Sequence, residues 1–344
     1  MRIAPSLWIT LLLLTGCGDR GDIANSPVAG EWHRFENAVG HRNYLLQVPA
    51  TAKNNAGAPV PLVVYLHGCG RPVETAAAST GWSELARQQG FAVVYPEQTD
   101  SGCWTWSDAG HQHRDAGEPS IIAGITQQVM TQIQVDPARV FIIGTSAGGY
   151  MANIMGVSYP EVYAAIGILA AGPYGLGSNS VPDVSGRLSF EEMGSRARVM
   201  PAFIAQSSTD QLNPAAAAEL AVQQWLGLAD HADDGSLNGS VLRTPASEET
   251  RLAEQPPEPG SGDACVSNAP NLCPGGVIGF QHHYPCTVMH YLDASGESLI
   301  DFWLVNGRMH TYASGDDPNG PNLATAAYAF FLKHPQNGAG LGPG

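Results

Sequence analysis

Short apolar runs alternate along this chain with segments whose apolar residues recur at helical spacing. The pattern predicts strands at residues 43–48, 62–66, 91–95, 140–143, 164–169, 202–206 and 299–305, and near 287–291. It predicts helices near 83–89, over 120–134, from just after the 140–143 strand to about 157, and over 215–228 and 322–332. Apolar strands that alternate with helices indicate an α/β fold with a mostly parallel central sheet and helices on both faces.

The N-terminal segment has the pattern of an export signal. Residues 7–14 are almost entirely apolar but too few to span a bilayer. They lead into Leu14-Thr15-Gly16-Cys17, which resembles the lipobox of bacterial lipoproteins, where the cysteine becomes the lipidated first residue. We expect a lipoprotein signal peptide over residues 1–17, lipidated at Cys17. An ordinary cleaved secretory signal is the alternative, and both predict export.

The rest of the chain is predicted to form one large domain. Residues 18–30 read as a polar tether and residues 335–344 as a flexible tail, with a catalytic domain over 31–334. Within it, residues 230–264 are acidic, rich in Pro, Gly and Ser, and lack periodicity. This segment is expected to be an exposed insertion, either a flap or a loop that is merely tolerated.

The charge balance excludes some classes of partner. The net charge is −15 and the chain has only two lysines, which argues against binding nucleic acid or anionic lipid through electrostatics. We expect no nucleic-acid partner, membrane contact only through a lipid anchor, and a monomer.

The strand at 140–143 runs into Gly144-Thr145-Ser146-Ala147-Gly148, with a helix predicted behind it. Gly-x-Ser-x-Gly between strand and helix is typical of a nucleophile elbow, a sharp turn that lifts a serine hydroxyl clear of the sheet. The pentapeptide alone also occurs in ordinary loops. The strand before it and the helix after it favour the nucleophile elbow here. Ser146 is therefore the candidate nucleophile.

A serine nucleophile needs a base, and the base needs an acid to orient it. In folds with this elbow the order is serine, acid, histidine, each after a strand. Asp210 follows the 202–206 strand and His310 follows the 299–305 strand. Asp210 could instead only cap the next helix. His290 comes before the last strand and is the less suitable base.

The tetrahedral intermediate needs backbone N–H groups that converge on its oxyanion. The N–H of Ala147 is one candidate. The second is the N–H of Cys69 in Leu66-His67-Gly68-Cys69-Gly70, in which His67 is expected to be a structural anchor. This chemistry requires no metal and no cofactor.

An export context permits disulfides. Cys69 and Cys103 each follow a predicted strand at the same edge of the sheet, so we pair them. Cys265 and Cys273 could close a small loop and leave Cys286 as a buried thiol. A Cys265–Cys286 pair is the alternative.

From about Arg42 to His334 the chain resembles the polyhydroxybutyrate depolymerase family, which includes related feruloyl and acetylxylan esterases. The resemblance rests on the elbow, the residue 66–70 loop, and the segments 95–98, 103–106, 117–120, 135–140 and 159–160. It implies an α/β-hydrolase fold, hydrolysis of carboxylic esters, and Trp104 and Trp106 near the acyl-binding cleft. Tyr312 stands where the family usually has a tryptophan, which alters the expected cleft wall.

The resemblance leaves three functions open. The first is an exported serine esterase that acts on short hydroxyalkanoate oligomers or polyester. The second is a feruloyl or acetylxylan esterase of plant cell-wall material. The third is a non-catalytic envelope-binding lipoprotein. We find no linker to a polymer-binding module, so soluble oligomers or small esters are expected as readily as polymer.

Overall fold

Strands that are apolar along their whole length form the middle of the sheet. The computed structural model describes residues 30–53, 58–98, 100–177, 182–251, 284–307, 310 and 321–336. All residues of β3 (Val60–Leu66), β4 (Ala92–Pro96), β6 (Ala165–Leu169) and β7 (Ala202–Ser207) are buried. Side chains buried on both faces of a strand require cover on both sides of the sheet.

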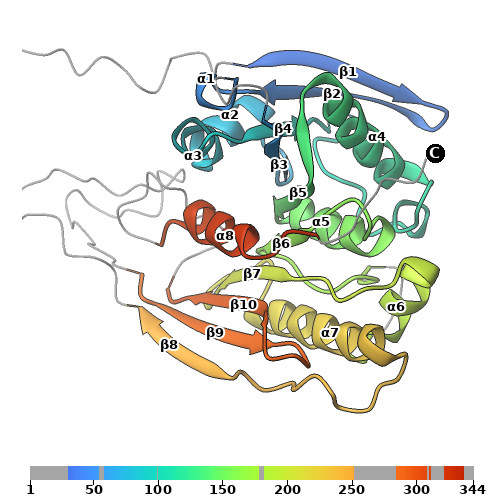
Figure 1. The fold of residues 1–344 in the computed structure, drawn as a ribbon, viewed down its shortest axis with the longest axis vertical. Coiled ribbons are helices and arrows are strands. Elements are labelled where there is room, and N and C mark those ends of the chain that lie inside the picture. Colours follow the sequence, from blue (N-terminus) through green and yellow to red (C-terminus); the bar gives the residue numbers. More distant parts are fainter. Residues whose placement is uncertain are drawn as a thin grey trace, which may run out of the picture.

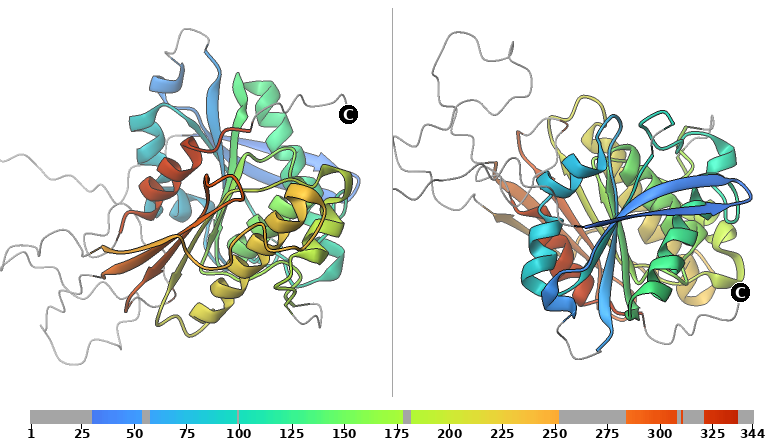
Figure 2. Two further views of the ribbon diagram at one scale, coloured as in Figure 1. Left: turned by 60° about the horizontal axis from the view of Figure 1, so that its bottom comes forward. Right: turned by 90° about the horizontal axis from the view of Figure 1, so that it is seen from above.

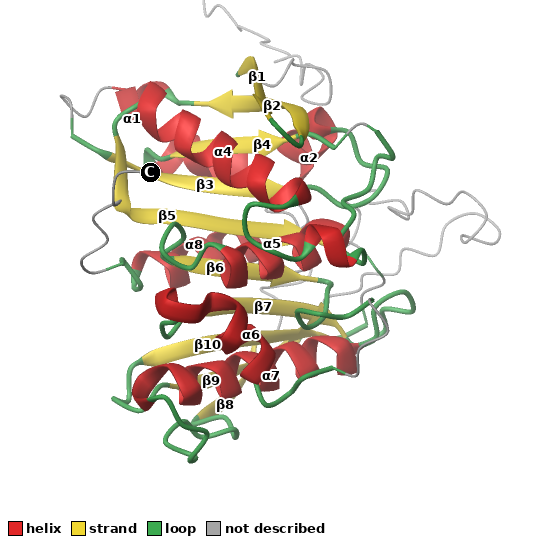
Figure 3. Ribbon diagram, turned by 90° about the vertical axis from the view of Figure 1, so that its right-hand side faces the viewer, coloured by secondary structure: helices red, strands yellow, loops and turns green. Residues whose placement is uncertain are grey.

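Ten strands of the described part form one sheet in the order β1-β2-β4-β3-β5-β6-β7-β10-β9-β8 (Figure 3). The other six are β1 (Glu31–Asn37), β2 (Gly40–Gln47), β5 (Val135–Thr145), β8 (Ser247–Arg251), β9 (Cys286–Leu292) and β10 (Ser298–Val305). The strands from β4 to β10 in this order are parallel. An antiparallel pair flanks them on each side.

Helices cover both faces of the sheet (Figures 1 and 2). One face packs against α4 (Gly117–Gln132), α5 (Ala147–Ser158), α6 (Arg187–Met193) and α7 (Ala215–Asp234). The other packs against α2 (Val73–Ser79), α3 (Trp82–Gln89) and α8 (Leu323–Leu332). The short α1 (Ala50–Lys53), η2 (Ala109–His111) and η3 (Gly194–Arg196) complete the described elements. The predicted α/β-hydrolase fold class, with a mostly parallel sheet covered on both faces, is confirmed.

The edge strands depart from the sequence expectations. β1 alternates exposed and half-buried residues, and all five residues of β8 are exposed, so neither strand has the apolar run that marks the central strands. Both are held by backbone pairing, β1 to β2 and β8 to β9. The helices α1, α2 and α6 were also not predicted, since they are only four to seven residues long.

The expected insertion at 230–264 does not start where the composition suggested. α7 continues to Asp234, and β8 lies inside the segment. The helix continues because Asp230 is buried and serves as an anchor, with its carboxylate accepting the N–H groups of Gly239 and Ser240. Residues 252–264 lie outside the described part of the chain.

The topology sets where the chemistry can lie. The carboxyl ends of parallel strands meet at one edge of a sheet, where ligands bind in α/β folds. β5 ends just before Ser146, β7 just before Asp210 and β10 shortly before His310. The three residues therefore share one edge. Within the described residues, no helix combines the length and apolar character that a membrane span requires.

We predict that Phe331→Ala lowers the free energy of unfolding by about 3–5 kcal/mol, the usual cost of deleting a buried ring. Phe331 in α8 is fully buried and stacks on Phe141 of β5, with ring centroids 4.9 Å apart. The neighbouring Leu332 is 44% exposed, and Leu332→Ala should change stability by no more than about 0.5 kcal/mol. Urea denaturation checks both values. Equal losses would contradict the assignment of α8 to the core.

Candidate active site

Ser146 occupies a strained turn between β5 and α5. Its backbone has φ 58° and ψ −122°, in the region that non-glycine residues rarely adopt. A Cβ on Gly148 would lie 2.1 Å from the carbonyl oxygen of Leu66, and one on Gly144 would lie 2.2 Å from that of Gly148. Only glycines permit this approach, so the two glycines of the motif have a direct steric reason here.

The structure brings Ser146, Asp210 and His310 together as a hydrogen-bonded series. His310 Nε2 lies 3.0 Å from Ser146 Oγ, and His310 Nδ1 lies 2.6 Å from Asp210 Oδ2. A carboxylate oxygen can only accept, so Nδ1 carries the proton and Nε2 faces the serine hydroxyl as an acceptor. This is the geometry that a general base requires.

Asp210 is held rigidly at the start of this series. Its side chain is fully buried, and its second oxygen, Oδ1, accepts the N–H groups of Leu212 and Asn213, each at 2.9 Å. The carboxylate thus caps the following turn and orients His310 at the same time. The alternative that Asp210 only caps the next helix is wrong, because the N-cap of α7 is Pro214 and no side chain caps that helix.

Two further residues that the sequence analysis missed support Asp210. The Tyr150 hydroxyl donates to Asn213 Oδ1 at 3.0 Å, and Asn213 Nδ2 donates to the carbonyl of Ala170 at 2.9 Å. Burial, with a smaller contribution from the Asp210 carboxylate, raises the pKa of Tyr150 to about 12 and keeps it a neutral donor. A sequence signal exists, since Tyr150 lies one helical turn after Ser146.

Two backbone N–H groups are available beside the serine. Ala147 begins α5, and the first N–H groups of a helix have no partner within it. Among the described residues, neither the N–H of Ala147 nor that of Cys69 has a hydrogen-bond acceptor. The residue 66–70 loop lies against the elbow, because a Cβ on Gly68 would be 3.5 Å from Ser146 Cβ. The arrangement can serve as an oxyanion hole.

Both ring nitrogens of His67 are hydrogen bonded within the protein. It is buried, its Nδ1 donates to the carbonyl of Gly68 at 2.9 Å, and its Nε2 accepts the N–H of Gln98 at 3.0 Å. Burial lowers the pKa of His67 below its usual value of 6.5. A neutral ring with one donor and one acceptor nitrogen fits this role as an anchor.

The two tryptophans occupy different environments. Trp104 is 2% exposed, and its indole N–H donates to the carbonyl of His67 at 3.0 Å. The expected substrate contact is therefore not supported for Trp104, which packs beneath the loop because its one polar atom finds a buried partner. Trp106 is half-buried and stacks on Tyr150, with centroids 3.9 Å apart. Tyr312 lies outside the described residues.

The cysteine pairing of this region is confirmed. Cys69 and Cys103 form a disulfide, and the N–H of Gly70 donates to the carbonyl of Gly102 at 2.6 Å beside it. Cys286 is a buried free thiol in β9, as the first of the two alternatives expected. Cys17, Cys265 and Cys273 lie outside the described residues.

A family model described as "Esterase PHB depolymerase" matches residues 43–241, more than half of the chain. The chain belongs to this esterase family. The match includes the elbow, the residue 66–70 loop and Asp210, and it ends before His310.

Curated relatives align with part of the chain. Poly(3-hydroxyalkanoate) depolymerase C of Paucimonas lemoignei is 37% identical over 41% of this chain and 34% of its own length. Probable acetylxylan esterase A of Aspergillus fumigatus is 28% identical over 53% of this chain and 50% of its own. The chain thus matches half or less of the length of these relatives.

A solved structure extends the likeness in fold to most of the chain. The acetyl xylan esterase from Aspergillus awamori superposes with a TM-score of 0.62 at 19% identity, covering 88% of this chain and 99% of that one. At that identity the likeness concerns the fold alone. In the ranges that the structure describes, no three His, Cys, Asp or Glu side chains are grouped as ligands for a metal ion.

We predict that His67 makes this PHB depolymerase-family fold less stable in mild acid. The unfolded chain protonates His67 near pH 6.5, whereas the folded protein binds that proton only at lower pH. The contribution of neutral His67 to the free energy of unfolding is therefore fully present above pH 6.5. It is lost as the pH falls through the folded-state pKa of His67. Urea denaturation at about pH 7.5 and about pH 5.5 should show a larger loss for the wild type than for His67→Gln, which cannot titrate. Equal losses would remove His67 as a source of the pH dependence.

Proposed function

We propose that this protein is a serine esterase that hydrolyses carboxylic esters through an acyl-enzyme. The observation that carries the proposal is the position of His310, hydrogen bonded to Ser146 through Nε2 and to Asp210 through Nδ1. Membership of an esterase family supports the same reaction class. A non-catalytic lipoprotein would not need all three groups in this geometry.

In the first step Ser146 Oγ attacks the ester carbonyl carbon while His310 Nε2 takes the hydroxyl proton. The N–H groups of Ala147 and Cys69 stabilise the oxyanion, each donor contributing on the order of a few kcal/mol in the transition state. Collapse of the intermediate breaks the bond to the alcohol, which leaves with the proton from His310. A water molecule then attacks the acyl-enzyme by the same route and frees the acid and Ser146.

The substrate class we propose is short hydroxyalkanoate esters, as soluble oligomers or polyester. The named activity of the Paucimonas lemoignei relative supports this. The surroundings of the triad also contain apolar surface: Leu212 is 74% exposed directly beside Asp210, and Trp106 is half-buried against Tyr150. An acetylxylan or feruloyl esterase is the second candidate, supported by the Aspergillus fumigatus relative.

We further propose that the protein is exported. The Cys69–Cys103 disulfide supports an oxidising compartment, because such bonds are rare where thiols are kept reduced. Lipidation at Cys17 remains part of this proposal and rests on the sequence of residues 14–17 alone.

We predict that Ser146→Ala and His310→Ala each lower kcat on p-nitrophenyl butyrate by about 10⁴-fold or more, since triad members act as a unit. The chain offers a matched control in His290, which also pairs with an aspartate, its Nδ1 lying 2.7 Å from Asp301 Oδ1. His290→Ala should keep wild-type kcat. Loss of activity in His290→Ala with retention in His310→Ala would reject the assignment of the base.

We predict that the purified protein hydrolyses hydroxybutyrate oligomers with a kcat/KM at least about tenfold higher than for methyl ferulate or acetylated xylan. Differences in substrate contacts within a binding pocket can supply a ratio of this size. A polyhydroxybutyrate film in the same series separates polymer from oligomer hydrolysis. Product release is followed by titration of the acid formed. A preference for acetylated xylan would select the second candidate.

A further inference from the structure

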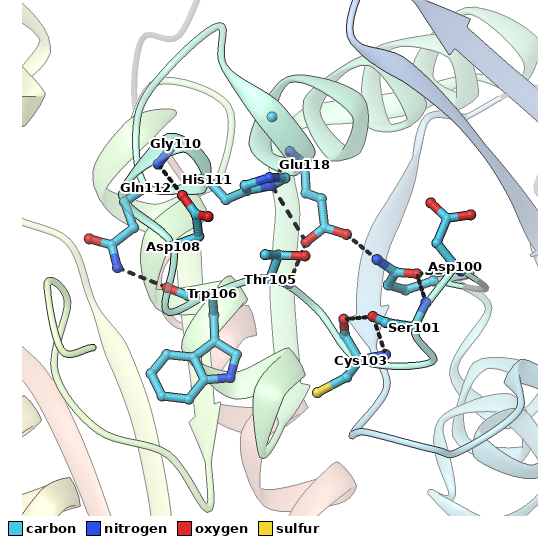
Figure 4. A network of polar contacts seen from close by, with 12 residues as sticks. Asp100, Ser101, Cys103, Thr105, Trp106, Asp108, Gly110, His111, Gln112 and Glu118 are labelled. Atoms are coloured by element: carbon cyan, nitrogen blue, oxygen red, sulfur yellow. Dashed lines mark hydrogen bonds and ion pairs between the residues drawn. The ribbon is translucent and has the colours of Figure 1, made fainter. Parts of the chain in front are cut away.

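Glu118, in the first turn of α4, is a buried carboxylate outside the triad. It is 1% exposed, and its oxygens accept from Arg42 Nη2 at 3.1 Å, Gln98 Nε2 at 2.5 Å and the N–H of Thr105 at 2.7 Å. Figure 4 shows this carboxylate between His111, Thr105 and the segment that carries Asp100 and Ser101. A carboxylate is retained in the interior only where several donors compensate for its lost hydration.

Two of the three donors to Glu118 come from the two ends of one loop. We call Gln98 and residues 100–105 the Cys103 loop. Gln98 binds one carboxylate oxygen and Thr105 binds the other. Arg42 also connects Glu118 to this loop, because its second guanidinium nitrogen lies 3.0 Å from the carboxylate of Asp100. Glu118 therefore fixes where the Cys103 loop begins and where it ends.

The Cys103 loop in turn holds the loop that carries the Cys69 N–H. The N–H of Gln98 donates to His67 Nε2, and the Trp104 indole donates to the carbonyl of His67, each at 3.0 Å. The Cys69–Cys103 disulfide and the hydrogen bond from Gly70 to Gly102 complete the connection. Every one of these links joins the Cys103 loop to residues 67–70.

The triad is held by other elements. Asp210 is fixed by the turn that contains Leu212 and Asn213, and His310 follows β10. None of the hydrogen bonds of Glu118 in the described residues reaches these groups. Glu118 can thus affect the oxyanion donors without changing the base.

We propose that Glu118 is a positioning residue that sets the place of the Cys69 N–H through the Cys103 loop. The inference rests on the proposed esterase function. The charge and both acceptor oxygens are needed, because three donors converge on the carboxylate. In Glu118→Gln the amide nitrogen replaces one acceptor oxygen and meets a donor from the Cys103 loop or Arg42. The loop must then shift, and the Cys69 N–H moves with it.

The test compares the kinetic constants of Glu118→Gln with those of the wild type. The concentration of active sites in each sample is measured by titration with a fluorophosphonate, and the rates are divided by it. We expect kcat on p-nitrophenyl butyrate to fall by about tenfold or more with KM nearly unchanged, since a misplaced oxyanion donor acts on the transition state. A boronic acid forms a B–O bond with Ser146 Oγ and becomes a tetrahedral anion that mimics this state. Its inhibition constant should rise by a similar factor. The pH midpoint of kcat/KM should stay in place.

Asp230→Asn is the matched control. Asp230 is also 1% exposed, accepts N–H groups from Gly239 and Ser240, and holds a loop distant in sequence from residues 67–70. This variant should lose stability but retain kcat and the boronate inhibition constant. If Glu118→Gln does not fold, Gln98→Met removes one donor to Glu118, together with the side-chain oxygen that accepts the N–H of Asp100 in the same loop. It keeps the backbone N–H that binds His67 and should show a smaller loss in the same direction.

The proposal is overturned if folded Glu118→Gln or Gln98→Met keeps wild-type kcat and boronate affinity. It is also overturned if Asp230→Asn loses both to the same extent, or if the pH midpoint moves, which would place the effect on His310. Failure of the esterase assignment has a separate signature, namely full activity in Ser146→Ala.

Discussion

The contact on which the site depends is the approach of α5 to the end of β3. The first turn of the helix passes so close to the carbonyl of Leu66 that Gly148 has no room for a side chain. Ser146, two residues earlier, has a backbone conformation that costs about 1–3 kcal/mol and that the surrounding structure must stabilise. Because β3 and β5 are neighbours in the sheet, this one contact brings Ser146 and the residue 66–70 loop together.

Around that contact, two supports act from opposite sides. Across β7, the turn after Asp210 fixes the acid, with Asn213 and Tyr150 behind it. Towards β4, Glu118 and the Cys103 loop fix the residue 66–70 loop. Each support is centred on a buried carboxylate that accepts hydrogen bonds from several donors, and such a network makes the local geometry rigid. The serine lies where the two supports meet.

The central strands of the sheet, and the residues that follow them, could be predicted from the sequence alone. Parallel strands buried on both faces leave an unbroken apolar run, so β3, β5 and β7 could be recognised, and with them the positions of Ser146 and Asp210. His310 followed from chain order after β10. The residues of these central strands are themselves apolar, so their own side chains specify where the strands lie.

The sequence did not predict the elements whose structure depends on contacts with residues elsewhere in the chain. β1 and β8 are polar strands that exist because a neighbouring strand pairs with them. Asp230 belongs to α7 because a later loop binds its carboxylate. Trp104 could not be separated from Trp106, since burial of one and partial exposure of the other depend on contacts with distant residues.

The parallel pairing of β10 with β7 has a consequence for how this chain can change in length. Val305 lies opposite Ser207, so the register of these two strands alone returns the chain to the edge where His310 follows. The loop between α7 and β8, residues 235–246, does not enter that register. Since each doubling of a loop costs only about 0.6 kcal/mol in closure entropy, this loop can grow or shrink over evolution, or accept a grafted module, while the distance from His310 Nε2 to Ser146 Oγ stays the same.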